Sequence, residues 1–171
     1  MPVDDEPLFP DNEPELLVGS DPGSQLANRI RRLVSQQLYG VLCTQGQGQP
    51  YGSLIAFAFS DDLSRAVFAT PIATRKYRLL SECDRVSLVV DNRPHYPRDM
   101  MKVEALTATG RATEVPRSPG FEKLESLLIG RHPQLKSFVK ASSCALFRID
   151  IFRFFHVGRF QEVGQWTPPL R

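Results

Sequence analysis

The chain has 171 residues, of which 42% are hydrophobic and 23% charged, so we expect one soluble globular domain with its own core. The three cysteines, Cys43, Cys83 and Cys144, are too few and too widely spaced for a disulfide framework or a CxxC zinc site. No apolar run reaches the roughly 18 residues of a membrane span, and no signal sequence is recognisable. These features exclude disulfide-rich and membrane-spanning classes and predict a cytoplasmic protein.

The net charge of +2 conceals an asymmetry along the chain. Residues 1–23 hold seven of the 19 acidic residues, five of the 14 prolines and no lysine or arginine. The rest therefore carries 12 acidic against 21 basic residues, which favours an anionic partner: a nucleotide, a phosphate-bearing cofactor or a nucleic acid. We expect residues 1–23 to form an acidic arm that lies on the basic body or on a neighbouring subunit, or else to be a solvated tail.

A helix over residues 22–39 is the first predicted element. Asp21 is a favourable cap, Pro22 suits the first helical position and Gly40 is a natural end. Apolar side chains recur at helical spacing and predict its buried face: Leu26, Ile30, Leu33, Val34 and Leu38.

Apolar runs at 40–44, 51–59 and 65–69 predict three strands after this helix. The turn sequence SDDL at 60–63 joins the last two into a hairpin. Both faces of 51–59 are nearly apolar, which predicts that both are covered by other parts of the protein.

A second helix is predicted from about Thr74, and Gly110 indicates a bulge or a bend in a long alternating segment. The elements that follow this helix are predicted, in chain order, as a strand at 86–91, a loop at 92–101, an alternating strand at 102–115, a helix from Ser118 to Gly130, a short helix at 133–140 and one long or two short strands at 142–157. Strands in hairpin-like succession do not follow the βαβ rhythm of a parallel sheet. The pattern predicts a mainly β fold, a small antiparallel barrel with peripheral helices.

Two cations open the second predicted helix, at the end that disfavours positive charge. Arg75 and Lys76 follow Thr74 in the first turn, where the helix terminus already carries partial positive charge. A bound phosphate would turn this penalty into an attraction by engaging both side chains, the threonine hydroxyl and free backbone N–H groups. The alternative is that both side chains extend into solvent.

The three histidines predict no metal site, because none has a partner at metal-ligand spacing. His132 precedes a proline and is interpreted as a helix cap, His156 as a structural residue of an aromatic strand, and His95 as part of an exposed loop at a pocket rim. Sequence signatures of serine hydrolases, zinc proteases, P-loop proteins and dinucleotide-binding folds are missing.

The order of these segments resembles the FMN-binding split-barrel family related to pyridoxamine 5′-phosphate oxidase. The resemblance rests on YGVLCTQGQGQPYGSLIAFAF, TRKYRLLSECDRVSLVVDN and ALTATGRATEV, and it extends over residues 25–166. It implies a six-stranded antiparallel split β-barrel over residues 24–171, assembled as a homodimer with two FMN molecules at the subunit interface.

The resemblance also implies which residues hold FMN. Its phosphate would contact Thr74, Arg75 and Lys76, the residues that the helix-terminus argument selects. The flavin ring would lie against the backbone of two strands, at Ser53, Leu54 and Ile55 and at Ala69 and Thr70. Asn92, from either subunit, would contact the ring or the ribityl chain. Trp166 would lie near the flavin of the partner.

The resemblance favours an FMN-dependent oxidoreductase that acts on a small molecule. The C-terminal sequence HVGRFQEVGQWTPPLR departs from the arginine and histidine pattern that holds the substrate phosphate in the oxidase itself, which argues against vitamin B6 oxidation. A deazaflavin or haem is an alternative cofactor, and a non-catalytic flavin or haem carrier is the alternative function. Nucleic-acid binding is the least favoured hypothesis, because the basic residues are scattered along the chain.

Overall fold

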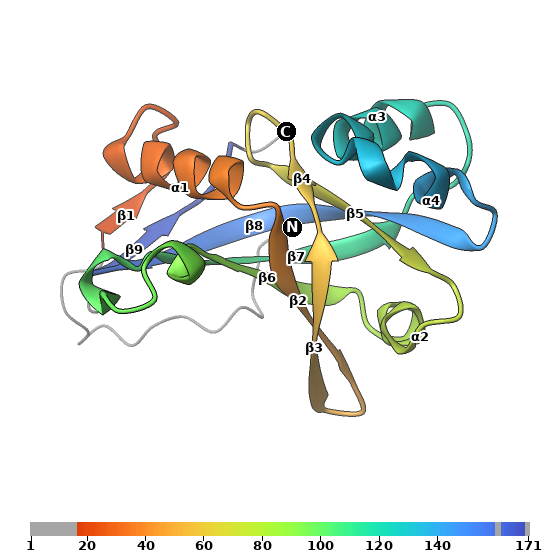
Figure 1. Ribbon diagram of the computed structural model, residues 1–171, viewed down its shortest axis with the longest axis horizontal. Helices are drawn as coiled ribbons and strands as arrows, with labels where there is room; N and C mark the ends of the chain where they lie inside the picture. Colours follow the sequence, from red (N-terminus) through yellow and green to blue (C-terminus); the bar gives the residue numbers. More distant parts are fainter. Residues whose placement is uncertain (1–16, 160–161, 170–171) are drawn as a thin grey trace.

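One twisted sheet organises the protein, whose computed structural model describes residues 17–159 and 162–169 (Figure 1). The strands are β1 (Leu17–Gly19), β2 (Tyr39–Gly46), β3 (Gln49–Ala56), β4 (Ala58–Phe59), β5 (Arg65–Pro71), β6 (Arg85–Asp91), β7 (Ala105–Glu114), β8 (Cys144–Gly158) and β9 (Glu162–Trp166). The helices are α1 (Gln25–Gln36), α2 (Arg75–Glu82), α3 (Phe121–Arg131) and α4 (Lys136–Lys140), with short 3₁₀ turns η1 (Arg93–His95), η2 (Met100–Lys102) and η3 (Pro133–Leu135).

Strand β8 joins the two parts of the sheet. The main path runs β1-β9-β8-β7-β6-β2-β3, while β5 pairs with β8 and with β4 outside that path. Residues 144–150 of β8 pair with β5, and residues 154–158 pair with β9. β8 thus changes its neighbour part-way along its 15 residues, while β7 runs beside both parts.

The predicted mainly β fold with peripheral helices is confirmed, although three details of the six-stranded antiparallel barrel differ. The described part of the chain has nine strands, β1 runs parallel to β9, and the sheet is not closed. The two additional terminal strands have three and five residues, too short for a period-two pattern to stand out. β1 lies at the end of the predicted arm, and residues 1–16 of that arm lie outside the described residues.

Helix α1 begins later and ends earlier than predicted. Ser24 caps it, since its Oγ accepts a hydrogen bond from Ala27 N at 3.1 Å. Asp21 instead accepts from Gly23 N at 2.9 Å, in the turn before the helix. Because the helix ends at Gln36, Leu38 leaves the buried face and is 46% exposed.

The predicted bulge at Gly110 is confirmed. Thr109 lies opposite Arg153, whereas Gly110 lies opposite Ile151, so Phe152 is an extra residue on β8. The absence of a side chain on Gly110 lets the two strands approach closely at the bulge, because a Cβ here would collide with the backbone of β8.

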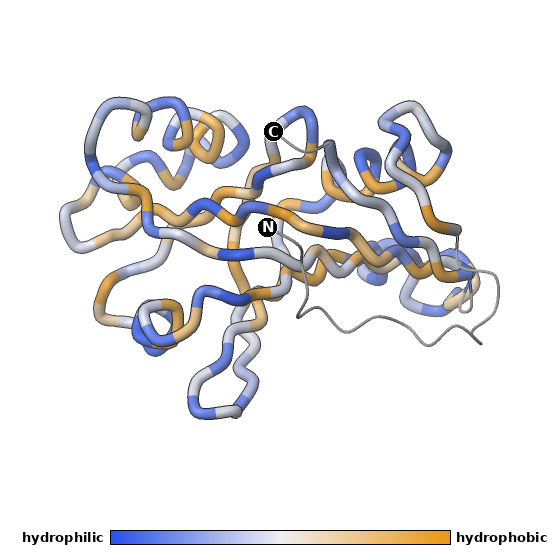
Figure 2. The backbone as a smooth tube through the Cα atoms, turned by 180° about the vertical axis from the view of Figure 1, so that it is seen from behind, coloured by the Kyte–Doolittle hydropathy of each residue, from blue (hydrophilic) through white to orange (hydrophobic). Residues whose placement is uncertain are grey.

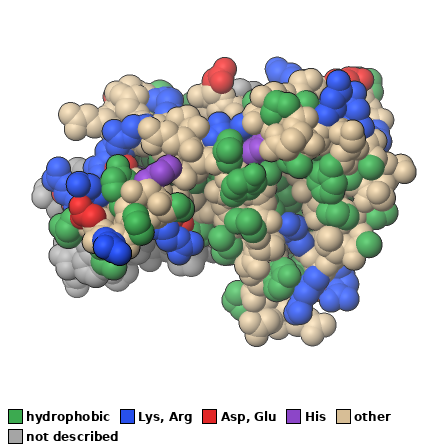
Figure 3. All heavy atoms as spheres, in the orientation of Figure 1, with side chains coloured by type: hydrophobic (Ala, Val, Ile, Leu, Met, Phe, Trp, Pro, Cys, Tyr) green, Lys and Arg blue, Asp and Glu red, His purple; other side chains and the backbone are tan. Residues whose placement is uncertain are grey.

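Strand β3 is an edge strand, which corrects the expectation that both faces of 51–59 are covered. It pairs with β2 alone among the described strands, and Leu54 is 69% exposed. Figure 3 shows hydrophobic side chains over β3 and basic side chains over α2 on the same face. The apolar run is interrupted at Phe57, between β3 and β4, where the side chain is buried in the core.

Two hydrophobic clusters fill the interior. The larger one lies between α1 and the sheet, and the smaller one lies beneath α3 and α4. Figure 2 shows hydrophobic residues along the central strands and a hydrophilic tip on the β2–β3 hairpin. No helix in the described residues is long and apolar enough to cross a membrane.

Candidate functional site

The start of helix α2 is fixed to the end of strand β5 by a hydroxyl network. Thr74 caps the helix, accepting a hydrogen bond from Tyr77 N at 3.2 Å and donating one to Pro71 O at 2.9 Å. Its Oγ1 also lies 3.0 Å from Oγ1 of Thr70, which is 1% exposed. The first turn of α2, with its free N–H groups, is therefore held in place by side chains of both elements.

The two predicted cations open α2 without an acidic partner. Arg75 is exposed and Lys76 half-buried, and neither pairs with a carboxylate among the residues that the structure describes. Burial lowers the pKa of Lys76, because desolvation penalises its charged form. Two unpaired cations at a helix N-terminus form a local positive potential suited to an anion.

Strand β3 lies beside this helix terminus. Cζ of Arg75 stands 5.0 Å from the ring centroid of Tyr51, a cation–π contact that connects α2 to β3. Ser53 and Leu54 follow on the same strand, whose second edge is unpaired in the described part of the sheet. A planar ligand at this edge has free backbone N–H and C=O groups within reach of its own polar atoms.

The structure places eight of the ten predicted residues on three elements that contact one another, α2, β3 and β5, and it places the other two elsewhere. The cluster around α2 and the neighbouring strands comprises Ser53, Leu54, Ile55, Ala69, Thr70, Thr74, Arg75 and Lys76. Trp166 lies in the core on β9, at the other end of the sheet from α2 (Figure 1), and is 0% exposed. Its ring packs against Phe154 at 5.7 Å, and its Nε1 donates to Asp21 O at 3.1 Å.

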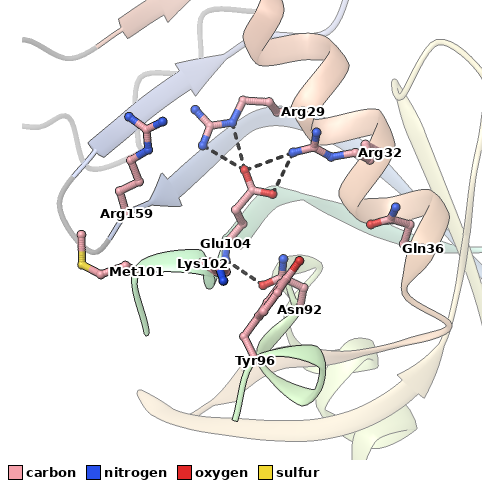
Figure 4. A pocket seen from close by; sticks show the side chains of 9 residues that line it. All are labelled: Arg29, Arg32, Gln36, Asn92, Tyr96, Met101, Lys102, Glu104 and Arg159. Atoms are coloured by element: carbon pink, nitrogen blue, oxygen red, sulfur yellow. Dashed lines mark hydrogen bonds and ion pairs between the residues drawn. The ribbon is translucent and has the colours of Figure 1, made fainter. Parts of the chain in front are cut away.

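Asn92 lines a cavity away from α2, which the sequence did not predict (Figure 4). Glu104 is the centre of this cavity: Arg29 Nε donates to it at 2.9 Å and Arg32 Nη2 at 3.1 Å. The partners are 75 and 72 residues apart, so no local pattern indicates them. The one available signal was a pair of arginines three residues apart on α1, which share a helix face.

Acid is expected to destabilise the protein through this cluster. Burial is the main cause that lowers the pKa of His156, and the charge of Arg29 lowers it further. Nε2 of His156 lies 3.4 Å from Glu104 Oε1. Burial of Glu104 acts to raise its pKa, but hydrogen bonds from Arg29 and Arg32 hold it below the ordinary value. Both groups bind protons more readily in the unfolded chain. The stability that depends on neutral His156 is therefore lost as the pH falls below 6.5, and the contribution of Glu104 is lost as the pH falls below 4.5, the ordinary pKa values of the two groups.

His156→Gln tests this pH dependence. We expect the urea concentration at the unfolding midpoint of the wild type to decrease when the pH is lowered from 7.5 to 5. The decrease should be smaller in the variant. An equal fall in both proteins would show that His156 is not responsible.

The family model described as pyridoxamine 5′-phosphate oxidase matches residues 26–157, which is most of the chain. The chain belongs to the pyridoxamine 5′-phosphate oxidase family. The family match includes the whole cluster around α2 as well as Asn92, and it ends before Trp166. No curated protein matches the chain.

Solved structures share the fold of this oxidase family member at low sequence identity. A heme binding protein from Mycobacterium smegmatis is 17% identical with a TM-score of 0.75, and the match covers 84% of this chain and 58% of that one. HutZ, the heme storage protein from Vibrio cholerae, is 18% identical with a TM-score of 0.65, covering 75% and 91%. A FAD-binding protein from Mesorhizobium loti is 19% identical with a TM-score of 0.63, covering 78% and 93%.

Proposed function

We propose that the chain is an FMN-binding flavoprotein, a small oxidoreductase of the pyridoxamine 5′-phosphate oxidase family. The observation that carries the proposal is the pair of unpaired cations, Arg75 and Lys76, on the capped N-terminus of α2 beside the free edge of β3. The half-buried ammonium of Lys76 fits a phosphate, because an anion would offset the desolvation of its charge. A bound flavin supplies hydride or electron transfer.

The chain's own residues would bind and orient the flavin. Thr74, Arg75 and Lys76 would hold the phosphate through charge-assisted hydrogen bonds. The backbone of β3 at Ser53–Ile55 would donate to and accept from the ring edge. Ala69 and Thr70, at the end of β5, would limit how deeply the flavin ring enters the site between β3 and α2.

We propose that a second copy of the chain covers the exposed apolar face. Tyr39 and Leu54 are exposed on one face of the β2–β3 pair, while Leu38, just before β2, and Ile72, just after β5, are exposed as well. Apolar groups gathered beside a candidate cofactor site indicate a protein interface. A homodimer would enclose the cofactor between its subunits and leave a small-molecule substrate access to the ring.

A non-catalytic haem-binding role is the second candidate. It is favoured by the similarity to a heme binding protein and to a heme storage protein, and by the exposure of His95, since His132 and His156 are buried. Nδ1 of His95 accepts a hydrogen bond from the amide nitrogen of Gln37 at 3.5 Å, so a metal bound by His95 would have to displace this contact. The visible spectrum of the purified protein distinguishes the candidates, because flavin gives two bands and haem a Soret band.

The double variant Arg75→Ala/Lys76→Ala tests the phosphate site. We expect its affinity for FMN to fall about 100-fold, because two charged hydrogen-bond donors are lost. Its affinity for riboflavin, which lacks the phosphate, should stay within about twofold of the wild type. Quenching of flavin fluorescence on titration measures both constants.

Arg78→Ala is the matched control, because Arg78 is exposed on the same helix. It removes one positive charge from α2 and should leave FMN affinity unchanged. Undiminished FMN affinity in the double variant would show that the phosphate binds elsewhere. Failure of the wild type to bind FMN, deazaflavin or haem would refute a cofactor-binding function.

A further inference from the structure

A cavity of about 640 Å³ lies between α1, the β6–β7 connection and the β8–β9 turn (Figure 4). It is apart from the candidate flavin site, since Figure 1 places η1 and η2 at the opposite end of the sheet from α2. Its lining consists of Arg29, Arg32, Gln36, Asn92, Tyr96, Met101, Lys102, Glu104 and Arg159. The volume is within the range of small-molecule sites.

Hydrogen-bond donors outnumber acceptors in this cavity. Among the described residues that line it, Glu104 is the one carboxylate; it is 13% exposed and already accepts hydrogen bonds from Arg29 and Arg32. Of the Arg32 guanidinium only Nη2 is engaged, so its Nε and Nη1 have no partner among the described residues. A ligand that supplies acceptors therefore suits the lining better than one that supplies donors.

Asn92 adds a fixed and unused donor. The residue is 7% exposed, and its Oδ1 accepts Glu104 N at 2.7 Å, which determines the orientation of the amide. Its Nδ2 has no partner in the described part of the chain and points toward Glu104 and the arginines in Figure 4. A buried amide held in this way is ready to donate to a ligand atom in the cavity.

The charge balance also favours an anion. Arg29 and Arg32 share the single carboxylate of Glu104, and Glu162 approaches Arg29 only at 3.7 Å from the exposed rim. Lys102 and Arg159 pair with Asp99 and Glu162 at 3.1 and 3.2 Å, but both pairs are solvent-exposed and therefore weak. Positive charge remains uncompensated beside Asn92.

We propose that this cavity binds a small oxyanion, a carboxylate or phosphate group, through Arg32 and Asn92. Arg29 and Glu104 position the arginine pair, and the side chains of Tyr96 and Met101 line the wall beside the body of the ligand. Arginine suits this role because its planar donors match the geometry of carboxylate and phosphate oxygens. The site goes beyond the proposed flavin site and does not depend on it.

Isothermal titration calorimetry of the full chain tests the proposal, with inorganic phosphate, succinate and neutral succinamide as probes in a low-salt, non-phosphate buffer. We expect phosphate or succinate to bind and succinamide not to. Arg32→Ala should weaken anion binding about tenfold, the effect of losing a charged hydrogen bond. Asn92→Asp should weaken it further, because the near-isosteric carboxylate repels an anion.

Arg31→Ala is the matched control, because Arg31 lies one position away on α1 and does not line the cavity. It should bind the anion as the wild type does. The stronger of the two anions identifies the ligand class. Two results would overturn the proposal: no binding of either anion by the wild type, or undiminished binding by a folded Arg32→Ala variant.

Discussion

Replacing Gly110 by alanine is expected to destabilise the protein by about 3 kcal/mol. Gly110 lies at the bulge between β7 and β8, where a Cβ would collide with the carbonyl oxygen of Asp150 and lie 2.9 Å from Cγ2 of Ile149. The carbonyl belongs to the backbone of a central strand, so it cannot move aside as a flexible side chain can. Chemical denaturation monitored by circular dichroism measures the loss.

Gly130→Ala is the control for this substitution. Gly130 lies in α3, and nothing stands within 4 Å of the position its Cβ would take. The same change should raise stability by about 0.5 kcal/mol, because alanine is the better helix former. A Gly110→Ala variant as stable as the wild type would contradict the prediction, because β7 and β8 would then separate at the bulge without any loss of folding free energy.

Trp166→Ala should cost about 4 kcal/mol and lower the melting temperature by about 10 °C. Trp166 is fully buried, so truncation leaves a cavity against Phe154 and removes the hydrogen bond to Asp21 O. Because it is the single tryptophan of the chain, its fluorescence reports on this part of the core. Acrylamide should quench that emission weakly in the folded protein.

The milder variant Trp166→Phe distinguishes a core residue from a cofactor contact. It should lower stability by about 1.5 kcal/mol and leave FMN affinity within about twofold of the wild type. Loss of FMN affinity at unchanged stability would instead place the indole at the cofactor. The structure favours the first outcome, since Trp166 has no exposed surface.

Local patterns predicted the elements whose signals are local. Gly110 marked the bulge because glycine inside a strand needs a structural reason, and Thr74 marked the start of α2 because a hydroxyl there can cap a helix. Asp21 was predicted as the cap of α1, whereas Ser24 caps it in the structure; both residue types are good caps, and the sequence does not distinguish them.

Features that depend on distant contacts escaped prediction. Trp166 was placed at the cofactor by resemblance, yet its burial follows from pairing between β9 and β8. The Glu104 cavity depends on partners from α1, which no spacing rule connects to β7. The exposure of Leu54 depends on which strand forms the edge of the sheet, and that is a property of topology rather than composition.

The double pairing of β8 has a consequence for how the chain folds. Among the described strands, β5 joins the rest of the sheet through β8 alone, although some 75 residues separate the two in sequence. During synthesis β4 and β5 therefore remain a two-stranded hairpin, marginal by itself, until β8 has left the ribosome. Loop closure over this distance predicts slow, non-local folding, with β5 and β8 gaining amide protection together in a pulsed hydrogen-exchange experiment.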